Sequence, residues 1–292
     1  MGTAIFSALA THVAGAATLA LLFFAQDRML FPAGPYPAGY ADDARSRGVM
    51  TISYGSNAAP MKAYYIAPAD GSASPTSPPG SAAAPDPLPV PRRLWVLFGG
   101  NGSPVLLFQG VGAACPDRAA GFLLVDYPGY GECGGQRGVA GTRHAANGAF
   151  AALARRMGKD TPAALAKATR LGVAGHSMGT GVALRFAADR PETDRVVLAA
   201  PFTRISDMVR RLVGPLASLL LKGDLDNMAR LRALSRRTAP PSVTVVHGDR
   251  DPIVPVAMSR TLAAAFPGFV KLTVVPGGDH GTVLVGMGAL LK

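Results

Sequence analysis

Residues 171–189 read LGVAGHSMGTGVALRFAAD, and this stretch carries the strongest indication of the fold. The apolar run Leu171–Ala174 predicts a buried strand, and the residues after Gly179 predict a helix that continues to about Asp189. Between them lies a G-x-S-x-G pattern centred on Ser177. Its two glycines permit a tight, strained turn that exposes the serine hydroxyl at the end of the strand. The pattern alone is a weak signal and also fits an ordinary glycine-rich turn, but its strand–turn–helix setting indicates a nucleophilic serine.

Short apolar runs recur on both sides of this turn. From Leu94 onward they alternate with helix-like segments such as Arg143–Met157 and Met258–Ala265, which predicts βαβ units and a parallel sheet covered by helices on both faces. With two strand-like runs nearer the N-terminus, we expect a mostly parallel sheet of eight strands. The predicted strands are Val49–Tyr54, Met61–Ile66, Leu94–Phe98, Phe122–Val125, Leu171–Ala174, Val196–Ala199, Val243–Val246 and Leu272–Val275. Ligands of such sheets bind at the carboxyl ends of the strands.

A serine hydroxyl needs a base, and the chain has five histidines among which to find it. His12 lies in a hydrophobic segment, and His144 begins a helix well before the serine. His176 adjoins the serine and should point away from it on a sharp turn, and His247 ends a strand. His280 lies in a glycine-rich loop after the last predicted strand. This is the place of the base in the order serine, acid, histidine, so we predict that His280 is the base.

The acid should follow the preceding strand, where Asp249 and Asp251 compete. A buried carboxylate is needed to hold the tautomer of the imidazole and to stabilise the imidazolium. Asp251 is favoured because the loop has to reach back toward His280 and because Pro252 rigidifies the turn just after it. Asp249 is then expected to pair with the neighbouring Arg250 at the surface. Local spacing alone leaves both carboxylates open.

The negative charge that develops during acyl transfer requires backbone N–H donors. One donor is expected to be the amide of Met178, directly after the serine. The other is expected from the loop Gly99–Ser103, where glycines permit close approach of the backbone to a substrate. We choose Asn101 as the second donor. A simple turn between two strands is the alternative interpretation of this loop.

The N-terminal part of the chain is apolar. Its first charged side chain is Asp27, and Ala4–Ala25 is long enough to cross a bilayer as a helix. We therefore expect residues 1–27 to be an uncleaved, single-pass anchor. A cleaved signal peptide, leading to a secreted or periplasmic protein, is the competing interpretation. Basic residues that follow the segment, beginning with Arg28, favour a catalytic domain on the cytoplasmic side under the positive-inside rule.

Residues 28–292 are expected to form one domain with two unusual segments. Residues 68–91 are rich in proline, alanine and serine and predict a disordered surface loop. Residues 202–240 predict a helical cap, which contains the apolar stretch Val213–Leu221 and more basic than acidic side chains. Such a cap could line an acyl pocket and rest its basic rim on anionic lipid. A plain packed helix with a solvated arginine face is the alternative.

The composition sets broad limits. The chain is 49% hydrophobic and 16% charged, which argues against a disordered protein, and its net charge is +11. Attraction to lipid headgroups is favoured over nucleic acid, because no nucleic-acid motif accompanies the basic residues. The two cysteines, Cys115 and Cys133, are too few for a disulfide scaffold or a familiar zinc site. They could form one bridge or remain two thiols, and no metal or organic cofactor is implied.

With these residues in place, the chain resembles the α/β-hydrolase superfamily over roughly residues 26–292. It looks most similar to the branch with an N-terminal membrane segment that includes eukaryotic protein depalmitoylases. The residues that carry the resemblance are Arg28–Pro32, Gly100–Gly102, Asp126–Gly131, Gly175–Gly179, Pro201–Thr203, Ile205–Asp207 and His247–Pro255. The family pattern supports Asp251 as the acid. The chain departs from that pattern at Gly99-Gly100, where the family usually has His-Gly.

This resemblance implies a serine hydrolase that cleaves carboxylic esters or thioesters through an acyl-enzyme on Ser177. Its expected substrates are small-molecule or lipid acyl groups. A serine peptidase or amidase is the alternative enzyme, because the same triad cleaves amides. A non-catalytic, membrane-tethered binding module of the same fold is the alternative outside enzymes, and the complete set of Ser177, Asp251 and His280 argues against it.

Overall fold

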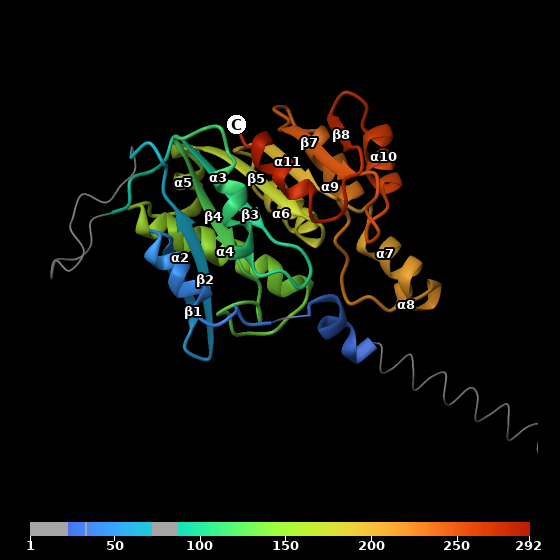
Figure 1. The fold of residues 1–292 in the computed structure, drawn as a ribbon, viewed down its shortest axis with the longest axis horizontal. Coiled ribbons are helices and arrows are strands. Elements are labelled where there is room, and N and C mark those ends of the chain that lie inside the picture. The colour runs from blue at the N-terminus through green and yellow to red at the C-terminus, as the bar shows by residue number, and fades with distance from the viewer. Residues whose placement is uncertain (1–22, 33, 72–86) are drawn as a thin grey trace, which may run out of the picture.

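The computed structural model describes residues 23–32, 34–71 and 87–292 (Figure 1). The predicted anchor falls almost wholly on residues 1–22 and so lies outside the described residues, of which 23–30 are helical. In the described part of the chain, no helix combines the length and the apolar character needed to cross a bilayer.

Eight strands form one sheet in the order β1-β2-β4-β3-β5-β6-β7-β8, as the apolar runs predict. The strands are β1 (Met50–Ser56), β2 (Ala59–Ile66), β3 (Arg93–Phe98), β4 (Ala120–Val125), β5 (Arg170–His176), β6 (Thr193–Ala199), β7 (Ser242–Gly248) and β8 (Val270–Val275). β2 pairs antiparallel with β1 and with β4, and every other pairing is parallel. The prediction of a mostly parallel sheet is therefore confirmed.

Helices cover both faces of this sheet (Figure 1). One core contains side chains of α2 (Tyr40–Ser46), the 3-10 turn η1 (Val105–Phe108), α3 (Gln109–Ala113) and α11 (Val283–Leu290). The other contains side chains of α4 (Val139–Arg156), α5 (Pro162–Ala168), α6 (Met178–Ala188), α9 (Asn227–Ser235) and α10 (Val256–Ala265). In β3, Trp95 belongs to the first of these cores and Val96 to the second. Both faces are buried, so the central strands are apolar throughout instead of alternating with polar residues.

The segment predicted as a cap contains three helices that differ in their packing. α9 packs against α6, and its Leu231 and Leu234 are fully buried in the core beside the sheet. α7 (Ile205–Leu212) and α8 (Pro215–Leu219) lie further out, and no residue of α8 is buried. Only these two helices therefore have the character of a cap, whereas α9 is part of the layer that covers the sheet.

The proline-rich segment re-enters the core at its end. Residues 72–86 lie outside the described residues, so the predicted disorder there stays a prediction. Leu88, in contrast, is buried, and its N–H donates to the carbonyl of Arg156 at 2.7 Å. The hydroxyl of Thr169 donates to the carbonyl of Pro91 at 2.7 Å. The expectation of a disordered surface loop is thus wrong for these last residues, because an apolar side chain among the prolines fills a place in the core.

Candidate active site

Ser177 occupies the sharp turn between β5 and α6. Its backbone has φ 53° and ψ −121°, a conformation that is costly for any residue with a Cβ. Neighbouring glycines make the turn possible: a Cβ added to Gly175 would overlap the carbonyl of Gly179, and one added to Gly179 would overlap that of Phe98. The serine N–H donates to the carbonyl of Ala199 at 2.9 Å, which ties the turn to the neighbouring strand. The geometry is that of a nucleophile held at the edge of the sheet.

His280 and Asp251, predicted from the sequence as base and acid, form a hydrogen-bonded pair. Nδ1 of His280 donates to Oδ2 of Asp251 at 2.7 Å, and the side chain of Asp251 is fully buried. The other carboxylate oxygen accepts from the amides of Ile253 at 2.8 Å and Val254 at 2.9 Å. These bonds fix the carboxylate, and the carboxylate fixes which imidazole nitrogen carries the proton.

Asp249, the competing carboxylate, has a different position. Its Oδ1 accepts from the N–H of Gly277 at 2.7 Å, and the residue is exposed. Asp249 therefore braces the glycine-rich loop that carries His280. Within the described residues it makes no hydrogen bond to the imidazole and no ion pair with Arg250, contrary to the sequence expectation.

His176 holds the backbone of this histidine loop, a role that the sequence did not reveal. Its Nε2 lies 2.8 Å from the carbonyl oxygen of His280, and the two rings are 4.6 Å apart. Burial, reinforced by the neighbouring His280 ring, lowers the pKa of His176 to about 4, so the ring is neutral at pH 7 and Nε2–H donates. Because His176 directly precedes Ser177, this bond places the base loop beside the nucleophile. Within the described residues, no hydrogen bond joins Ser177 Oγ to the imidazole of His280. In enzymes without bound substrate, the distance between nucleophile and base often exceeds that of a hydrogen bond.

His247 is a buried neighbour of Asp251, the predicted acid. It is fully buried, with Nδ1 2.6 Å from the hydroxyl of Ser259 and Nε2 2.9 Å from the carbonyl of Val254. Nε2 also lies 3.3 Å from Oδ2 of Asp251. Burial lowers the pKa of His247, which keeps the ring neutral. The sequence did not favour His247 as the base, and its contacts instead hold the loop that carries Asp251.

The loop predicted to supply the second amide donor lies against the nucleophile. A Cβ on Gly100 would stand 3.3 Å from Cβ of Ser177 and 3.0 Å from Nδ1 of His176, so only glycine leaves this approach open. Asn101 follows Gly100 directly in the chain. Met178 is the first residue of α6, where helix amides have no partner within the helix. Met178 follows Ser177 directly in the chain, and Asn101 is one residue beyond the close approach at Gly100, so their roles as amide donors stay predictions.

Tyrosines from the segment after β4 brace this loop. The hydroxyl of Tyr127 donates to the carbonyl of Gly99 at 3.0 Å. The hydroxyl of Tyr130 accepts from the N–H of Gly102 at 3.2 Å and donates to Oδ1 of Asn101 at 3.4 Å. The two hydroxyls therefore hold the loop at Gly99, Asn101 and Gly102.

Asp126 extends the brace to the end of the loop. Its carboxylate accepts from the N–H of Val105 at 2.6 Å and makes a short bond with the hydroxyl of Tyr36. That hydroxyl in turn accepts from the N–H of Leu106 at 3.1 Å. Burial raises the pKa of Asp126 to about 7, partly offset by the hydrogen bond from Tyr36. The start of η1, directly after the loop, is thereby held by the buried acid that follows β4.

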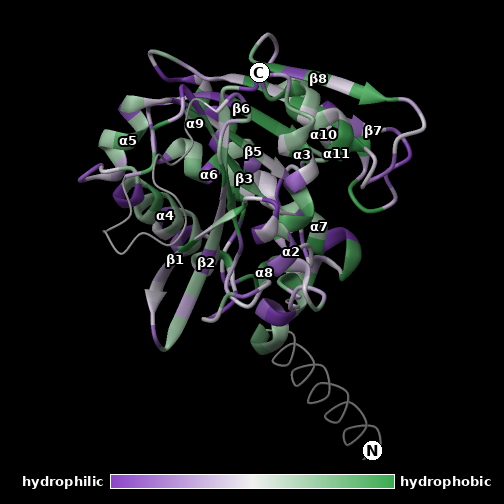
Figure 2. Cartoon of the chain, turned by 60° about the vertical axis from the view of Figure 1, so that its left-hand side comes forward, coloured by the Kyte–Doolittle hydropathy of each residue, from purple (hydrophilic) through white to green (hydrophobic). Residues whose placement is uncertain are grey.

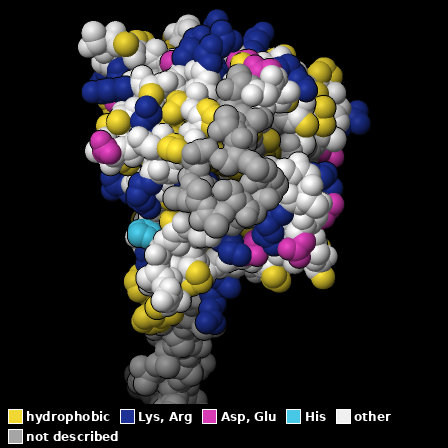
Figure 3. All heavy atoms as spheres, turned by 90° about the vertical axis from the view of Figure 1, so that its left-hand side faces the viewer, with side chains coloured by type: hydrophobic (Ala, Val, Ile, Leu, Met, Phe, Trp, Pro, Cys, Tyr) yellow, Lys and Arg dark blue, Asp and Glu magenta, His cyan; other side chains and the backbone are white. Residues whose placement is uncertain are grey.

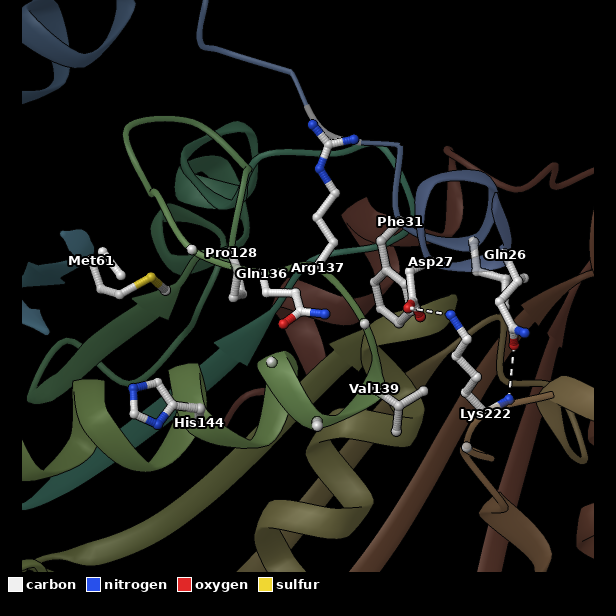
Figure 4. Close-up of a pocket in the computed structure, with 17 residues that line it drawn as sticks. Gln26, Asp27, Phe31, Met61, Pro128, Gln136, Arg137, Val139, His144 and Lys222 are labelled. Carbon is white, nitrogen blue, oxygen red and sulfur yellow. Dashed lines mark hydrogen bonds and ion pairs between the residues drawn. The ribbon is translucent and has the colours of Figure 1, made fainter. Parts of the chain in front are cut away.

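The structure also contains a cavity of about 470 Å³ (Figure 4). It is bounded by residues 26–31, the start of β2 and the beginning of α4; Met61 and His144 stand on one side, and Asp27 and Lys222 on the other. None of its lining residues is a member of the predicted site. Across the described residues, no group of three or more His, Cys, Asp or Glu side chains could hold a metal ion, and the cysteines at 115 and 133 are buried free thiols.

Residues 89–224 match the family model Hydrolase_4, described as serine aminopeptidase, S33. Two curated relatives, uncharacterized proteins of Mycobacterium tuberculosis strains CDC 1551 / Oshkosh and ATCC 25618 / H37Rv, are each 31% identical to the chain over 194 residues. The alignment covers 62% of this chain, and it spans 64% of the length of those relatives.

Several solved structures are similar in fold. An alpha-beta hydrolase from Vibrio vulnificus aligns with a TM-score of 0.60 and 16% identity over 92% of this chain and 90% of that one. The esterase PF2001 of Pyrococcus furiosus aligns with a TM-score of 0.58 and 15% identity over 87% and 91%. Est1E of Butyrivibrio proteoclasticus, solved with ferulic acid, aligns with 0.53 and 18% over 83% and 96%. The chain therefore shares its fold with these hydrolases, and its residues 89–224 are similar to the serine aminopeptidase S33 family model.

Proposed function

We propose that the chain is a serine hydrolase that cleaves carboxylic esters or thioesters through an acyl-enzyme on Ser177. The observation that carries the proposal is the bond of 2.7 Å between Nδ1 of His280 and the buried carboxylate of Asp251, next to a serine in a strained turn. A structural histidine has no need of a fully buried carboxylate that is itself held by two backbone amides. This arrangement is the one that turns an imidazole into a base for an adjacent hydroxyl.

The mechanism follows from the proton positions. Nδ1–H of His280 donates to Asp251, so Nε2 carries the lone pair that removes the proton from Ser177 Oγ. The serine oxygen attacks the substrate carbonyl, and the amides of Asn101 and Met178 donate to the oxyanion. When the tetrahedral intermediate collapses, the imidazolium gives its proton to the leaving alcohol or thiol. Water, activated by the same nitrogen, then attacks the acyl-enzyme and releases the acid.

Acyl esters and thioesters are the substrates favoured here. Two of the similar folds are named as an esterase and as a protein solved with ferulic acid, a carboxylic acid. The resemblance to the membrane-anchored depalmitoylase branch points the same way, as does an α7–α8 cap rich in apolar side chains. An N-terminal membrane anchor belongs to this proposal and places the enzyme near lipid-linked substrates.

A peptidase is the second candidate, because the family model that matches residues 89–224 is described as a serine aminopeptidase. The same nucleophile, base and amide donors act on amides as well as esters. Comparing turnover of aminoacyl amides with that of p-nitrophenyl acyl esters separates the two. A preference for amides would replace the ester hypothesis and leave the assignment of Ser177 unchanged.

Labelling with a fluorophosphonate probe tests the proposal. We expect the purified chain to be labelled and Ser177→Ala to be unlabelled, because the probe reacts only with an activated serine hydroxyl. Ser235→Ala, which removes a surface hydroxyl on α9, is the matched control and should keep full labelling. Esters of graded acyl length, assayed alongside, give the length that the pocket prefers.

Absence of labelling in a well-folded wild-type chain would instead support the non-catalytic binding module. Labelling that persists in Ser177→Ala would move the nucleophile to another residue.

A further inference from the structure

Exposed apolar side chains are concentrated in one region of the molecule. Of the ten large hydrophobic side chains exposed in the described residues, seven come from the helix at residues 23–30 and from the α7–α8 segment. We refer to these seven as the apolar cap patch: Phe23, Phe24, Met29, Leu212, Val213, Leu216 and Leu219. Leu219 and Phe24 are 79% and 75% exposed, so neither is covered by any described part of the chain. Isolated exposed apolar residues are ordinary, but a contiguous group of this size marks an interaction surface.

The two halves of the patch are joined by one buried polar side chain. Nε2 of Gln26 donates to the carbonyl of Leu220 at 3.0 Å, and its Oε1 accepts from the N–H of Lys222 at 2.8 Å. Beneath these bonds, Met29 contributes to a small apolar crevice together with Val213 and their neighbours. The residue 23–30 helix and α8 lie at the same end of the molecule (Figure 2). Their exposed side chains therefore form one surface.

Basic side chains lie on the same segments as this surface. Arg28, Arg210 and Arg211 are exposed, and none of them forms an ion pair within the described residues. Nζ of Lys222 lies 5.0 Å from the ring centre of Phe23 and is 3.5 Å from Asp27, the acidic residue on the helix. Figure 3 shows hydrophobic side chains gathered at the end where the described chain begins, with Lys and Arg side chains beside them.

We infer that the apolar cap patch binds the surface of an anionic lipid bilayer. Apolar side chains flanked by cations fit the boundary between acyl chains and negatively charged headgroups, where each basic residue adds to the attraction. A second copy of the chain fits less well, because a self-complementary contact brings the same cations of both copies together. The sequence directly before Phe23 is also apolar back to Ala4, apart from small polar residues and His12, so lipid contact on this side agrees with the predicted anchor.

Fluorescence of a tryptophan placed in the patch tests the inference. The full-length chain carrying Leu219→Trp is reconstituted into vesicles of phosphatidylcholine with or without phosphatidylglycerol, in which a fraction of the lipid has brominated acyl chains. The native Trp95 is fully buried and gives a constant background. We expect a blue-shifted emission and severalfold stronger quenching at position 219 than in the matched control Val285→Trp, whose side chain is equally exposed on α11.

The charge dependence is tested with a pair of double variants. Arg210→Gln/Arg211→Gln in the Leu219→Trp chain should lose most of the increase in quenching that phosphatidylglycerol causes. Arg118→Gln/Arg155→Gln, which removes two exposed arginines elsewhere, should retain it.

Three results would overturn the inference. One is a solvent-like, unquenched emission at position 219 while the protein is bound to vesicles. Another is a blue shift without lipid that depends on protein concentration, which would show contact between copies. The third is a lipid-independent shift at all concentrations, which would show that the chain covers the patch itself. The readout requires no turnover and can be repeated in Ser177→Ala, so its failure is distinct from failure of the proposed activity.

Discussion

At the scale of single residues, the choice between two neighbouring carboxylates is the clearest point to test. Asn at position 251 can still accept from the amides of Ile253 and Val254, but its NH₂ group faces Nδ1 of His280 and forces the proton onto Nε2. An imidazole in that tautomer cannot accept the serine proton. We therefore expect Asp251→Asn to lower kcat by about 10⁴ while the fold is retained.

The matched control is Asp249→Asn, since an amide oxygen can still accept from the N–H of Gly277. This variant should remain within a few-fold of wild type. Ester hydrolysis at saturating substrate, with circular dichroism to check folding, measures both. Equal losses in the two variants would contradict the assignment of the acid.

The sequence indicates which residues make up the candidate site, but it does not indicate the contacts that hold them in place. Ser177 and His280 follow from local pattern and chain order, because the turn and the loop have recognisable sequences. The position of His176 was not predictable in this way. Its partner is the carbonyl of His280, 104 residues away, and no local pattern reports which side chain a folded loop will contact. The sequence suggested that His176 points away from the serine, which says nothing of the loop that it holds.

At the scale of elements, the loop after β3 depends on tyrosines from the segment after β4. Tyr130→Phe removes the hydroxyl that contacts both Gly102 and Asn101, so the second amide donor should lose its fixed position. Loss of a whole donor costs about 10²–10³ in kcat, so mispositioning should cost less, about tenfold, with little change in KM. Tyr54→Phe, whose hydroxyl contacts the carbonyl of Ala145 on α4, is the control and should leave kcat unchanged. A rise in KM alone would show that Tyr130 contacts substrate instead.

The buried acid that holds η1 should give the fold a distinctive dependence on pH. The pKa of Asp126 is raised from 3.8 to about 7, mainly by burial, so the folded state binds a proton that the unfolded state has released between these values. Its contribution to stability is therefore present at low pH and is lost as the pH rises toward 7, by roughly 4 kcal/mol at most.

Urea unfolding of wild type and of Asp126→Asn at pH 4.5, 6 and 8 measures this effect. The difference in the free energy of unfolding between the two should favour wild type most at pH 4.5 and shrink toward pH 8, because the asparagine does not titrate. A difference that grows with pH would show that the carboxylate is stabilised in its ionised form.

At the scale of the whole molecule, the sheet was predictable because its central strands are buried on both faces and are apolar throughout. Leu94–Phe98 is such a strand, and along the sequence helical segments separate it from the other apolar strands. The packing of helices was less predictable. α9 and α8 both lie between β6 and β7 in sequence, yet Leu231 is fully buried and Leu219 is exposed. The apolar residues of a short helix do not by themselves specify which surface the helix will meet.

The first described helix is attached to the rest of the molecule by Gln26, and this attachment yields a prediction for the whole chain. Its side chain is buried and bonds the carbonyls of Phe23 and Leu220 and the N–H of Lys222. Gln26→Ala leaves the carbonyl of Leu220 and the N–H of Lys222 without these partners. We therefore expect the free energy of local opening between the residue 23–30 helix and the segment after α8 to fall by about 1–3 kcal/mol. Hydrogen exchange should show this loss as a rise on the order of tenfold to a hundredfold in the exchange rate of the Lys222 amide, while the amide of Val105 is unaffected.

The control is Gln136→Ala, because the side chain of Gln136 is exposed and makes no hydrogen bond in the described residues. If the Lys222 amide exchanged equally fast in wild type, the helix and the cap would not form one unit, and the two halves of the apolar cap patch would move independently.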